Sequence, residues 1–250
     1  MKRLLYVTLL LACPAWSQSV DSTTNFTIPL KSNFRSGFML EPSFAYTLTQ
    51  LTAIKSFFRA NQVEYNKKLD RVVAAGFGYR RQRMKAMIHS FFGLNQRLLP
   101  PKTSGNAPLI AQRLDLSGIA IFLGYDIANA RNNRAFINAG VGSIRYEYTL
   151  FRPTNQQVPF QTIFQYSPPV SVPSLYLDSG YWDVNVEIVQ REKRRDTFQW
   201  MSRLGYRRGF KATSWQSEAY QLVDAPQDRI GQFYLQVGLY ISHNRSSRPN

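Results

Sequence analysis

The feature of this chain that most constrains its fold is a two-residue alternation of apolar and polar side chains, repeated in separate short runs. Over residues 233–241 an apolar side chain occupies each odd position, and the even positions hold Tyr, Gln, Gly and Tyr. Similar alternation covers residues 182–188, 198–207 and 144–148. Because successive side chains of a β-strand point to opposite faces, this period predicts strands with two chemically different faces.

Further strands are predicted where the alternation is less regular, at residues 37–49, 69–80, 84–93 and 113–125. Pro42 weakens the first of these assignments, since proline cannot donate a hydrogen bond to a strand ladder. Gly118 and the apolar run that follows it indicate a bulge or a change of face. The chain therefore carries about eight candidate strands.

The connections between these strands alternate between long and short. The short connections are residues 81–83, 129–134 and 191–196, and the long ones are 50–68, 94–112, 151–179 and 211–229. Outer-membrane barrels show this asymmetry, with tight turns on the periplasmic side and extended loops outside the cell. We therefore expect an all-β fold, an up-and-down antiparallel transmembrane β-barrel of about eight strands, with both termini on the periplasmic side.

The composition supports a membrane location reached by strands and not by helices. No stretch approaches the roughly 20 apolar residues that a spanning helix needs. Charged residues make up 18% of the chain and aromatic residues 14%, whereas an average soluble domain carries about 25% charge. Aromatic side chains gather at membrane–water interfaces. We expect such a girdle from Tyr79, Tyr125, Tyr146, Tyr148, Trp182 and Tyr206.

The first residues have the pattern of an export signal. Lys2 and Arg3 precede a short apolar core at 4–12, and small residues occupy both ends of the tripeptide 15–17. Cleavage there would leave Gln18 as the first residue. We expect a signal peptide over 1–17, a periplasmic segment over 18–36, the barrel over 37–242 and a C-terminal tail over 243–250.

The single cysteine, Cys13, leaves two interpretations of this signal open. The sequence Leu-Leu-Ala-Cys over 10–13 resembles the lipobox of bacterial lipoproteins, in which Cys13 would carry the lipid. In the favoured interpretation Cys13 is removed with the signal, and the mature chain then has neither disulfides nor thiol chemistry.

The formal net charge of +16 predicts anionic partners. Export argues against nucleic acid, so outer-membrane lipid and lipopolysaccharide phosphates are the expected counter-charges. The short connections concentrate basic residues, at 80–83, 131–134 and 191–195. We interpret them as solvated turns that contact headgroup phosphates, and a docking patch for a periplasmic protein is the alternative.

Two segments carry a resemblance to a known family: Leu204-Gly205-Tyr206-Arg207 and the closing strand over 232–241. With the signal that ends before Gln18, they resemble the small outer-membrane β-barrels of the Bacteroidota, eight-stranded proteins of the OmpA and OmpX type. Many such barrels end on an aromatic residue, whereas this chain continues over 242–250. The resemblance implies a fold and a location and does not imply an activity.

An eight-stranded barrel is only wide enough for its own side chains to fill it. Buried charges must then be paired, so we expect a polar plug of inward-facing ions. The predicted members of this interior network are Glu41, Asp115, Arg145, Glu147, Asp183, Glu187, Arg203 and Arg207. Alternation alone does not decide which face meets water, so a soluble lipocalin-like binder stays an alternative.

Catalytic and metal chemistry find little support in the sequence. His89 stands beside Ser90, but adjacent strand residues point to opposite faces and cannot form one dyad. His243 lies at the edge of the last strand, and two histidines without a mature cysteine argue against zinc. We expect no enzyme, no metal and no cofactor.

Three functional hypotheses remain. The first is a structural, adhesive or ligand-binding barrel whose external loops meet a protein or glycan, and Tyr166, Tyr176 and Tyr220 could there stack on sugars or peptides. The second is a narrow channel or an accessory component of an export system. The third is a lipid-active barrel enzyme or a soluble lipocalin-like binder.

Overall fold

A computed structural model describes residues 36–65, 69–94, 109–128, 133–151, 171–190 and 198–244 of the chain. The expected signal peptide, Cys13, nearly all of the expected periplasmic segment and most of the C-terminal tail lie outside the described residues. Tyr166 and the basic clusters at 131–132 and 191–195 also lie outside them.

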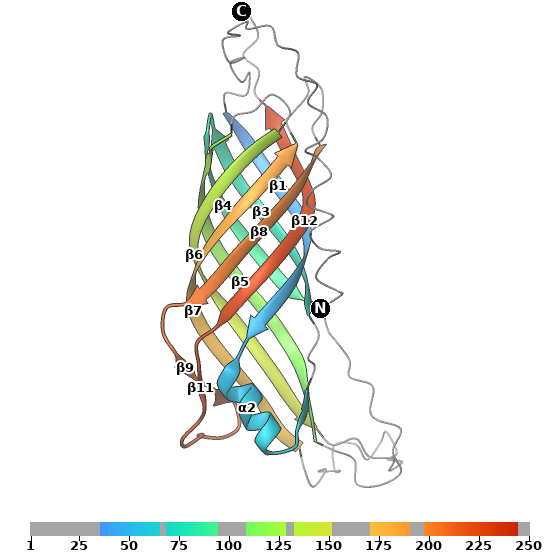
Figure 1. Ribbon diagram of the computed structural model, residues 1–250, viewed down its shortest axis with the longest axis vertical. Coiled ribbons are helices and arrows are strands. Elements are labelled where there is room, and N and C mark those ends of the chain that lie inside the picture. The colour runs from blue at the N-terminus through green and yellow to red at the C-terminus, as the bar shows by residue number, and fades with distance from the viewer. Residues whose placement is uncertain are drawn as a thin grey trace, which may run out of the picture. The chain divides into compact units, whose positions relative to one another are not determined.

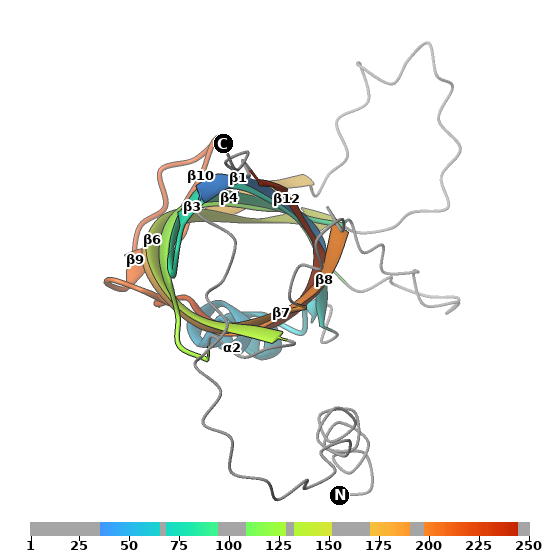
Figure 2. The ribbon, with the colours of Figure 1, turned by 90° about the horizontal axis from the view of Figure 1, so that it is seen from above.

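Within the described residues, eight long antiparallel strands form a closed barrel (Figures 1 and 2). They are β1 (Ser36–Gln50), β3 (Asp70–Arg81), β4 (Met84–Gly93), β5 (Ile110–Asp126), β6 (Asn133–Phe151), β7 (Ser171–Gln190), β8 (Phe198–Gly209) and β12 (Gly231–Asn244). Each pairs with the next long strand along the chain, and β12 pairs with both β8 and β1. The expected up-and-down barrel is confirmed.

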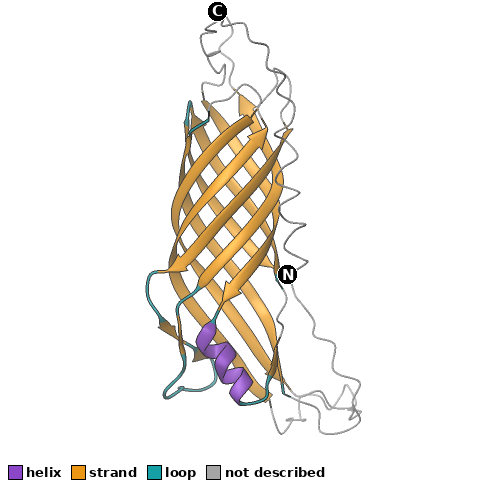
Figure 3. Ribbon diagram, viewed as in Figure 1, coloured by secondary structure: helices purple, strands orange, loops and turns teal. Residues whose placement is uncertain are grey.

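Short elements gather at one end of the barrel (Figure 3). They are α2 (Thr52–Ala60), β2 (Glu64–Tyr65), β9 (Thr213–Ser214), β10 (Gln216–Ser217) and β11 (Gln227–Asp228). β2 pairs with β5, β10 pairs with β7, and β9 pairs with β11. We call this end the loop end. At the opposite end, the turn end, β3 and β4 are joined by a tight turn in which Gln82 has a φ of 53°.

Two expectations about strand boundaries and one about a bulge need correction. The predicted loop over 151–179 is shorter, because β7 already begins at Ser171. β5 likewise begins at Ile110, inside the predicted loop over 94–112. The register shifts lie between Arg113 and Asp115 and between Tyr148 and Leu150, and not at Gly118. Pro42 is accommodated in β1 at a point where the β1–β12 register lacks a pair.

The outer face of the barrel wall is apolar. Side chains between 43% and 66% exposed lie on every long strand. They are Phe38, Leu40, Tyr46, Leu48, Val73, Phe77, Tyr79, Met84, Ile88, Phe92, Leu114, Ile119, Ile121, Leu123, Tyr125, Ile137, Val141, Val184, Val186, Ile188, Phe198, Trp200, Leu204, Phe233, Leu235 and Val237. A soluble monomer rarely exposes an apolar patch of more than a few hundred Å², whereas a lipid-facing wall requires one. The fold is therefore a transmembrane β-barrel. In the described residues no helix is long and apolar enough to cross a membrane.

Candidate functional site

The barrel interior holds an ion-pair quartet that ties four strands together. Lys85 Nζ on β4 lies 3.1 Å from a Glu41 oxygen on β1 and 2.5 Å from a Glu187 oxygen on β7. The Arg203 guanidinium on β8 bridges the same two carboxylates, each at 2.5 Å. These four side chains are buried. Charges removed from water are tolerated only when they are paired, so each member of the quartet depends on the others.

A second buried cluster surrounds Asp183 on β7. Arg207 Nε donates to this carboxylate at 2.8 Å, and the Tyr234 hydroxyl donates to it at 2.9 Å. Arg207 also donates to Gln232 Oε1 at 3.0 Å. The Tyr234 side chain can pass over residue 205 to Asp183 because this residue is glycine. A Cβ at position 205 would lie 2.4 Å from the tyrosine Cζ and hydroxyl oxygen. The absence of a side chain at Gly205 thus helps to satisfy the buried carboxylate.

Two asparagines join the quartet to the second cluster. Asn138 Nδ2 donates to Glu187 at 3.2 Å and to Asn185 Oδ1 at 2.7 Å. Asn185 Nδ2 in turn donates to Asp183 at 2.9 Å. The amide group both donates and accepts, which lets one chain of hydrogen bonds link carboxylates that would otherwise repel.

The polar chain continues toward the loop end. Gln232 Nε2 donates to Thr49 Oγ1 at 2.9 Å, and Thr49 Oγ1 donates to Asp70 at 3.1 Å. Asp70 also accepts from the Tyr146 hydroxyl at 2.9 Å and forms an ion pair with Arg113. Asp70 is therefore the carboxylate that connects the interior network to the rim of the barrel at the loop end.

At the turn end the interior is closed by cations that lie over an aromatic ring. The Arg80 guanidinium and the Lys85 ammonium lie 5.4 and 4.7 Å from the centroid of Phe136. Arg134 pairs with the buried Asp126 at 3.4 Å. Side-chain contacts thus extend through the interior from the turn end to the loop end.

An aromatic lid covers the loop end of the interior. Phe58 of α2 packs edge-on against Tyr148 of β6 at 5.4 Å and against Tyr65 of β2 at 5.9 Å. The Trp215 ring centroid also lies 5.7 Å from that of Tyr148. Phe58 and Trp215 are almost completely buried. We use "lid" for α2, β2 and the segment 213–228.

Asp228 fastens the two halves of the lid to each other. Its carboxylate accepts hydrogen bonds from the backbone N–H groups of Ala53 and Ile54, at 2.8 and 2.9 Å, and from Trp215 Nε1 at 2.9 Å. The first N–H groups of a helix have no partner within the helix, and the helix dipole favours a negative charge beside them. A residue 174 positions away in the sequence thus caps α2.

The structure places Glu41, Asp183, Glu187, Arg203 and Arg207 in the interior and brings Glu41, Glu187 and Arg203 into direct contact. It places the other expected members outside.

Asp115, Arg145 and Glu147 lie on the outer face, partly exposed, and their assignment to the interior is corrected. Arg145 instead pairs with Glu218 at 3.1 Å and faces Asp178 at 3.9 Å. The prediction failed because it assumed that charge always points inward, which holds only where the outer face meets lipid.

The aromatic girdle needs a similar correction. Tyr79 and Tyr125 are exposed on the outer face, as expected of interface residues. Trp182 and Tyr206 also face outward, with their ring centroids 5.9 Å apart. Tyr146 and Tyr148 instead point into the barrel, where they contact the network and the lid.

His89 and Ser90 point to opposite faces of β4, which confirms the argument against a dyad. His89 is buried and its Nε2 lies 3.2 Å from Gln236 Nε2, while Gln236 contacts Ser43 Oγ at 2.5 Å. His243 has no described side chain. Within the part of the chain that the structure describes, no group of three or more His, Cys, Asp or Glu side chains could hold a metal.

Sequence reasoning missed several interior residues: Lys85, Asp70, Arg113, Asn138 and Asn185. A signal existed for Lys85, because Met84 and Ile88 share one face of β4 and Lys85 and His89 share the other. Nothing local indicated the contact between Asp228 and α2.

Comparison with known proteins finds similar solved structures but no similar sequence. No protein-family model matches the chain, and no curated protein matches its sequence. Among solved structures, Neisserial surface protein A is similar over 82% of this chain and 96% of its own, with 10% identity and a TM-score of 0.48. OprG from Pseudomonas aeruginosa covers 86% of this chain and 99% of its own, with 11% identity and a TM-score of 0.43.

The outer membrane protease OmpT from Escherichia coli is similar at 9% identity and a TM-score of 0.36, over 88% of this chain and the whole of its own. Each of these barrels is at most 11% identical to this chain, and the likeness says nothing about activity. The narrower resemblance to Bacteroidota barrels stays a prediction.

Proposed function

We propose that the protein is a bacterial outer-membrane barrel whose interior is sealed and whose loop end is a binding surface. The observation that carries this proposal is the unbroken interior network under an aromatic lid. A polar interior under an apolar exterior suits a membrane-spanning scaffold, and a filled interior leaves no path for solutes. The loop end then becomes the part of the molecule through which it acts.

This proposal ranks above a channel or an accessory component of an export system. A channel needs a water-filled lumen, whereas Arg203, Glu41 and Glu187 meet in the interior. It also ranks above a lipocalin-like binder, which would need an apolar interior to hold its ligand. No catalytic step is included, because His89 and Ser90 point to opposite faces of their strand.

Exposed cations at the turn end support a second proposal, which concerns contact with lipid. Arg81 and Arg83 are exposed where β3 and β4 meet. If the loop end faces outward, these cations lie at the periplasmic headgroup layer, where phosphates are the natural counter-ions. We propose that they contact lipid phosphates, and vesicle flotation with anionic and neutral lipids would measure this contribution.

The test begins with cell fractionation and electrophoresis of unboiled and boiled samples. A protein in the outer-membrane fraction that migrates faster unboiled supports the barrel in its proposed location. A soluble periplasmic protein without that shift would overturn the proposal in favour of a lipocalin-like binder. Planar-bilayer recording then separates the remaining classes, since a sealed barrel gives no stable conductance. Steady conductance would favour the channel, and release of acyl chains from lipopolysaccharide would favour an enzyme.

A further inference from the structure

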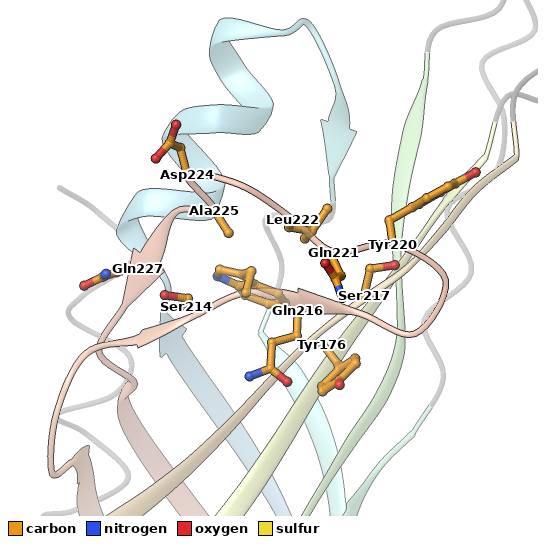
Figure 4. A pocket seen from close by; sticks show the side chains of 11 residues that line it. Tyr176, Ser214, Gln216, Ser217, Tyr220, Gln221, Leu222, Asp224, Ala225 and Gln227 are labelled. Atoms are coloured by element: carbon orange, nitrogen blue, oxygen red, sulfur yellow. The ribbon is translucent and has the colours of Figure 1, made fainter.

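A cavity of about 530 Å³ opens on the lid, between the start of β7 and the segment 214–227 (Figure 4). Its volume lies within the roughly 300–1,000 Å³ of small-molecule sites. Apart from Tyr176 on β7, all of the lining residues come from the single connection between β8 and β12. The ion-pair network and the aromatic lid contacts described above do not explain this cavity.

The cavity is anchored to the folded core. β10 pairs with β7 so that Gln216 lies opposite Tyr176, and β9 pairs with β11 so that Ser214 lies opposite Gln227. Trp215 forms part of the lining: its indole N–H donates to Asp228, and its backbone N–H donates to the Pro226 carbonyl at 3.1 Å. A site held in place before binding loses less entropy when a ligand arrives.

The lining chemistry is that of amides, hydroxyls and aromatic rings. Gln216, Gln221 and Gln227 each offer both donors and acceptors, and Ser214 and Ser217 add hydroxyls. Tyr176 and Tyr220 contribute rings with polar tips, and the Tyr220 side chain is 62% exposed. Groups that both donate and accept match a ligand rich in hydroxyls, and a tyrosine ring can cover the apolar face of a sugar.

The charge of the cavity argues against an anionic ligand. None of the residues that line it in the described part of the chain is basic, and Asp224 adds a carboxylate. The nearby Arg145 lies over the Tyr176 ring at 4.5 Å and is already paired with Glu218 at 3.1 Å, near Asp178. In a chain with a net charge of +16, a lining whose described residues include no basic side chain favours an uncharged ligand over an anionic one.

We propose that this cavity binds an uncharged oligosaccharide through the glutamine amides, the Asp224 carboxylate and the exposed tyrosine ring. The inference rests on the proposed function, because it names the ligand class of the loop-end surface. It predicts weaker binding of sulfated and phosphorylated glycans, because the described residues that line the cavity include the Asp224 carboxylate and no basic side chain.

The experiment uses the full chain purified in a detergent without a sugar headgroup. Isothermal titration with maltotriose, cellotriose and N-acetyllactosamine is compared with titration of a heparin tetrasaccharide and of an unrelated neutral peptide. We expect saturable binding of at least one neutral sugar and none of the heparin fragment. Gln216→Ala and Tyr220→Ala should each weaken that binding about tenfold, the loss of one good contact.

Gln190→Ala is the matched control, since Gln190 is exposed at the other end of β7 and should bind as the parent does. Faster migration of each unboiled variant verifies its fold. The inference is overturned if no neutral sugar binds, if the heparin fragment or the peptide binds better, or if the two cavity variants bind like the parent. Cell fractionation tests the proposed function separately from the titration. If the protein is found in the outer membrane but binds no sugar, only the assignment of the cavity is refuted.

Discussion

The barrel wall formed by β6 and β7 passes through two environments. In the region near the turn end its outer face is apolar and its inner face is charged, and in the region near the loop end this arrangement is reversed. Near the turn end, Val184 and Val186 face outward and Asp183 and Glu187 face inward. Near the loop end of β6, Arg145 and Glu147 face outward, whereas Ile144, Tyr146 and Tyr148 face inward.

The backbone geometry of a strand is the same in both regions, so the difference comes from what surrounds the wall. Lipid outside favours apolar side chains and leaves the polar ones to pair in the interior. Water outside reverses the preference, as in any soluble sheet. The exchange on β6 lies between Val141, which is 54% exposed, and Arg145. We place the edge of the hydrocarbon layer nearer the loop end between these two residues.

The largest effect should follow from Arg203→Ala, which leaves Glu41 and Glu187 with only Lys85 between them. Removing one partner of a buried ion pair costs about 3–5 kcal/mol. We expect a large fall in the urea midpoint in detergent and loss of the fast-migrating unboiled band. Arg208→Ala is the control, because this neighbouring arginine on the same strand is exposed.

Asp183→Asn should act in the same direction, because it weakens the ion pair with Arg207. If Arg203→Ala and Asp183→Asn both kept the heat resistance of the parent, the interior would not depend on its ion pairs, and the sealed-plug interpretation would be wrong.

The second prediction tests whether the outer face of the wall meets lipid. Ile121 is 58% exposed on β5, and an arginine at the bilayer midplane of a barrel costs about 2–4 kcal/mol. Ile121→Arg should therefore lower the yield of folded barrel in lipid vesicles. Glu147→Arg should fold as the parent does, because position 147 faces water opposite Asp115. An Ile121→Arg protein that folds equally well and becomes more soluble would contradict a lipid-facing wall.

The sequence allowed much of the membrane-spanning wall to be predicted. Alternation over 182–188 and 198–207, together with the assumption that charge points inward, predicted interior positions for Asp183, Glu187, Arg203 and Arg207, and the structure places all four there. The same reasoning failed for Arg145 and Glu147, because alternation reports two different faces and does not report which of them meets lipid. A strand that leaves the membrane keeps its two-residue alternation, but its outer face then favours polar side chains instead of apolar ones.

The lid could not be predicted, for a different reason. The contact of Asp228 with Ile54 joins residues 174 positions apart, and no local pattern encodes it. The helix α2 lies within the predicted loop over 50–68, and the N–H groups of Ala53 and Ile54 in its first turn donate to Asp228.

The third prediction concerns that contact. Asp228→Ala removes the acceptor of two helix N–H groups and of the Trp215 indole, at a cost of about 1–3 kcal/mol for unsatisfied buried donors. Because these donors belong to the lid, we expect faster proteolysis of the segment 210–230 while the unboiled band keeps its mobility. Glu64→Ala, at an exposed position of β2, should leave the digestion rate unchanged. Collapse of the whole barrel in Asp228→Ala would show that lid and wall are one cooperative unit.

The smallest effect should come from Arg145→Ala, and it completes the comparison between the two regions. Arg145 carries the same charge as Arg203 and also faces two carboxylates, but its side chain is 37% exposed and those of Asp178 and Glu218 are more so. Exposed ion pairs contribute about 0–1 kcal/mol, because solvent screens them and their side chains lose entropy on pairing. Urea unfolding of Arg145→Ala should therefore differ little from that of the parent, and the small difference should vanish in high salt.

A loss of stability as large as that of Arg203→Ala would place Arg145 in a medium of low dielectric constant. The hydrocarbon edge would then lie closer to the lid than Val141, and the exchange of faces on β6 would need a cause other than water.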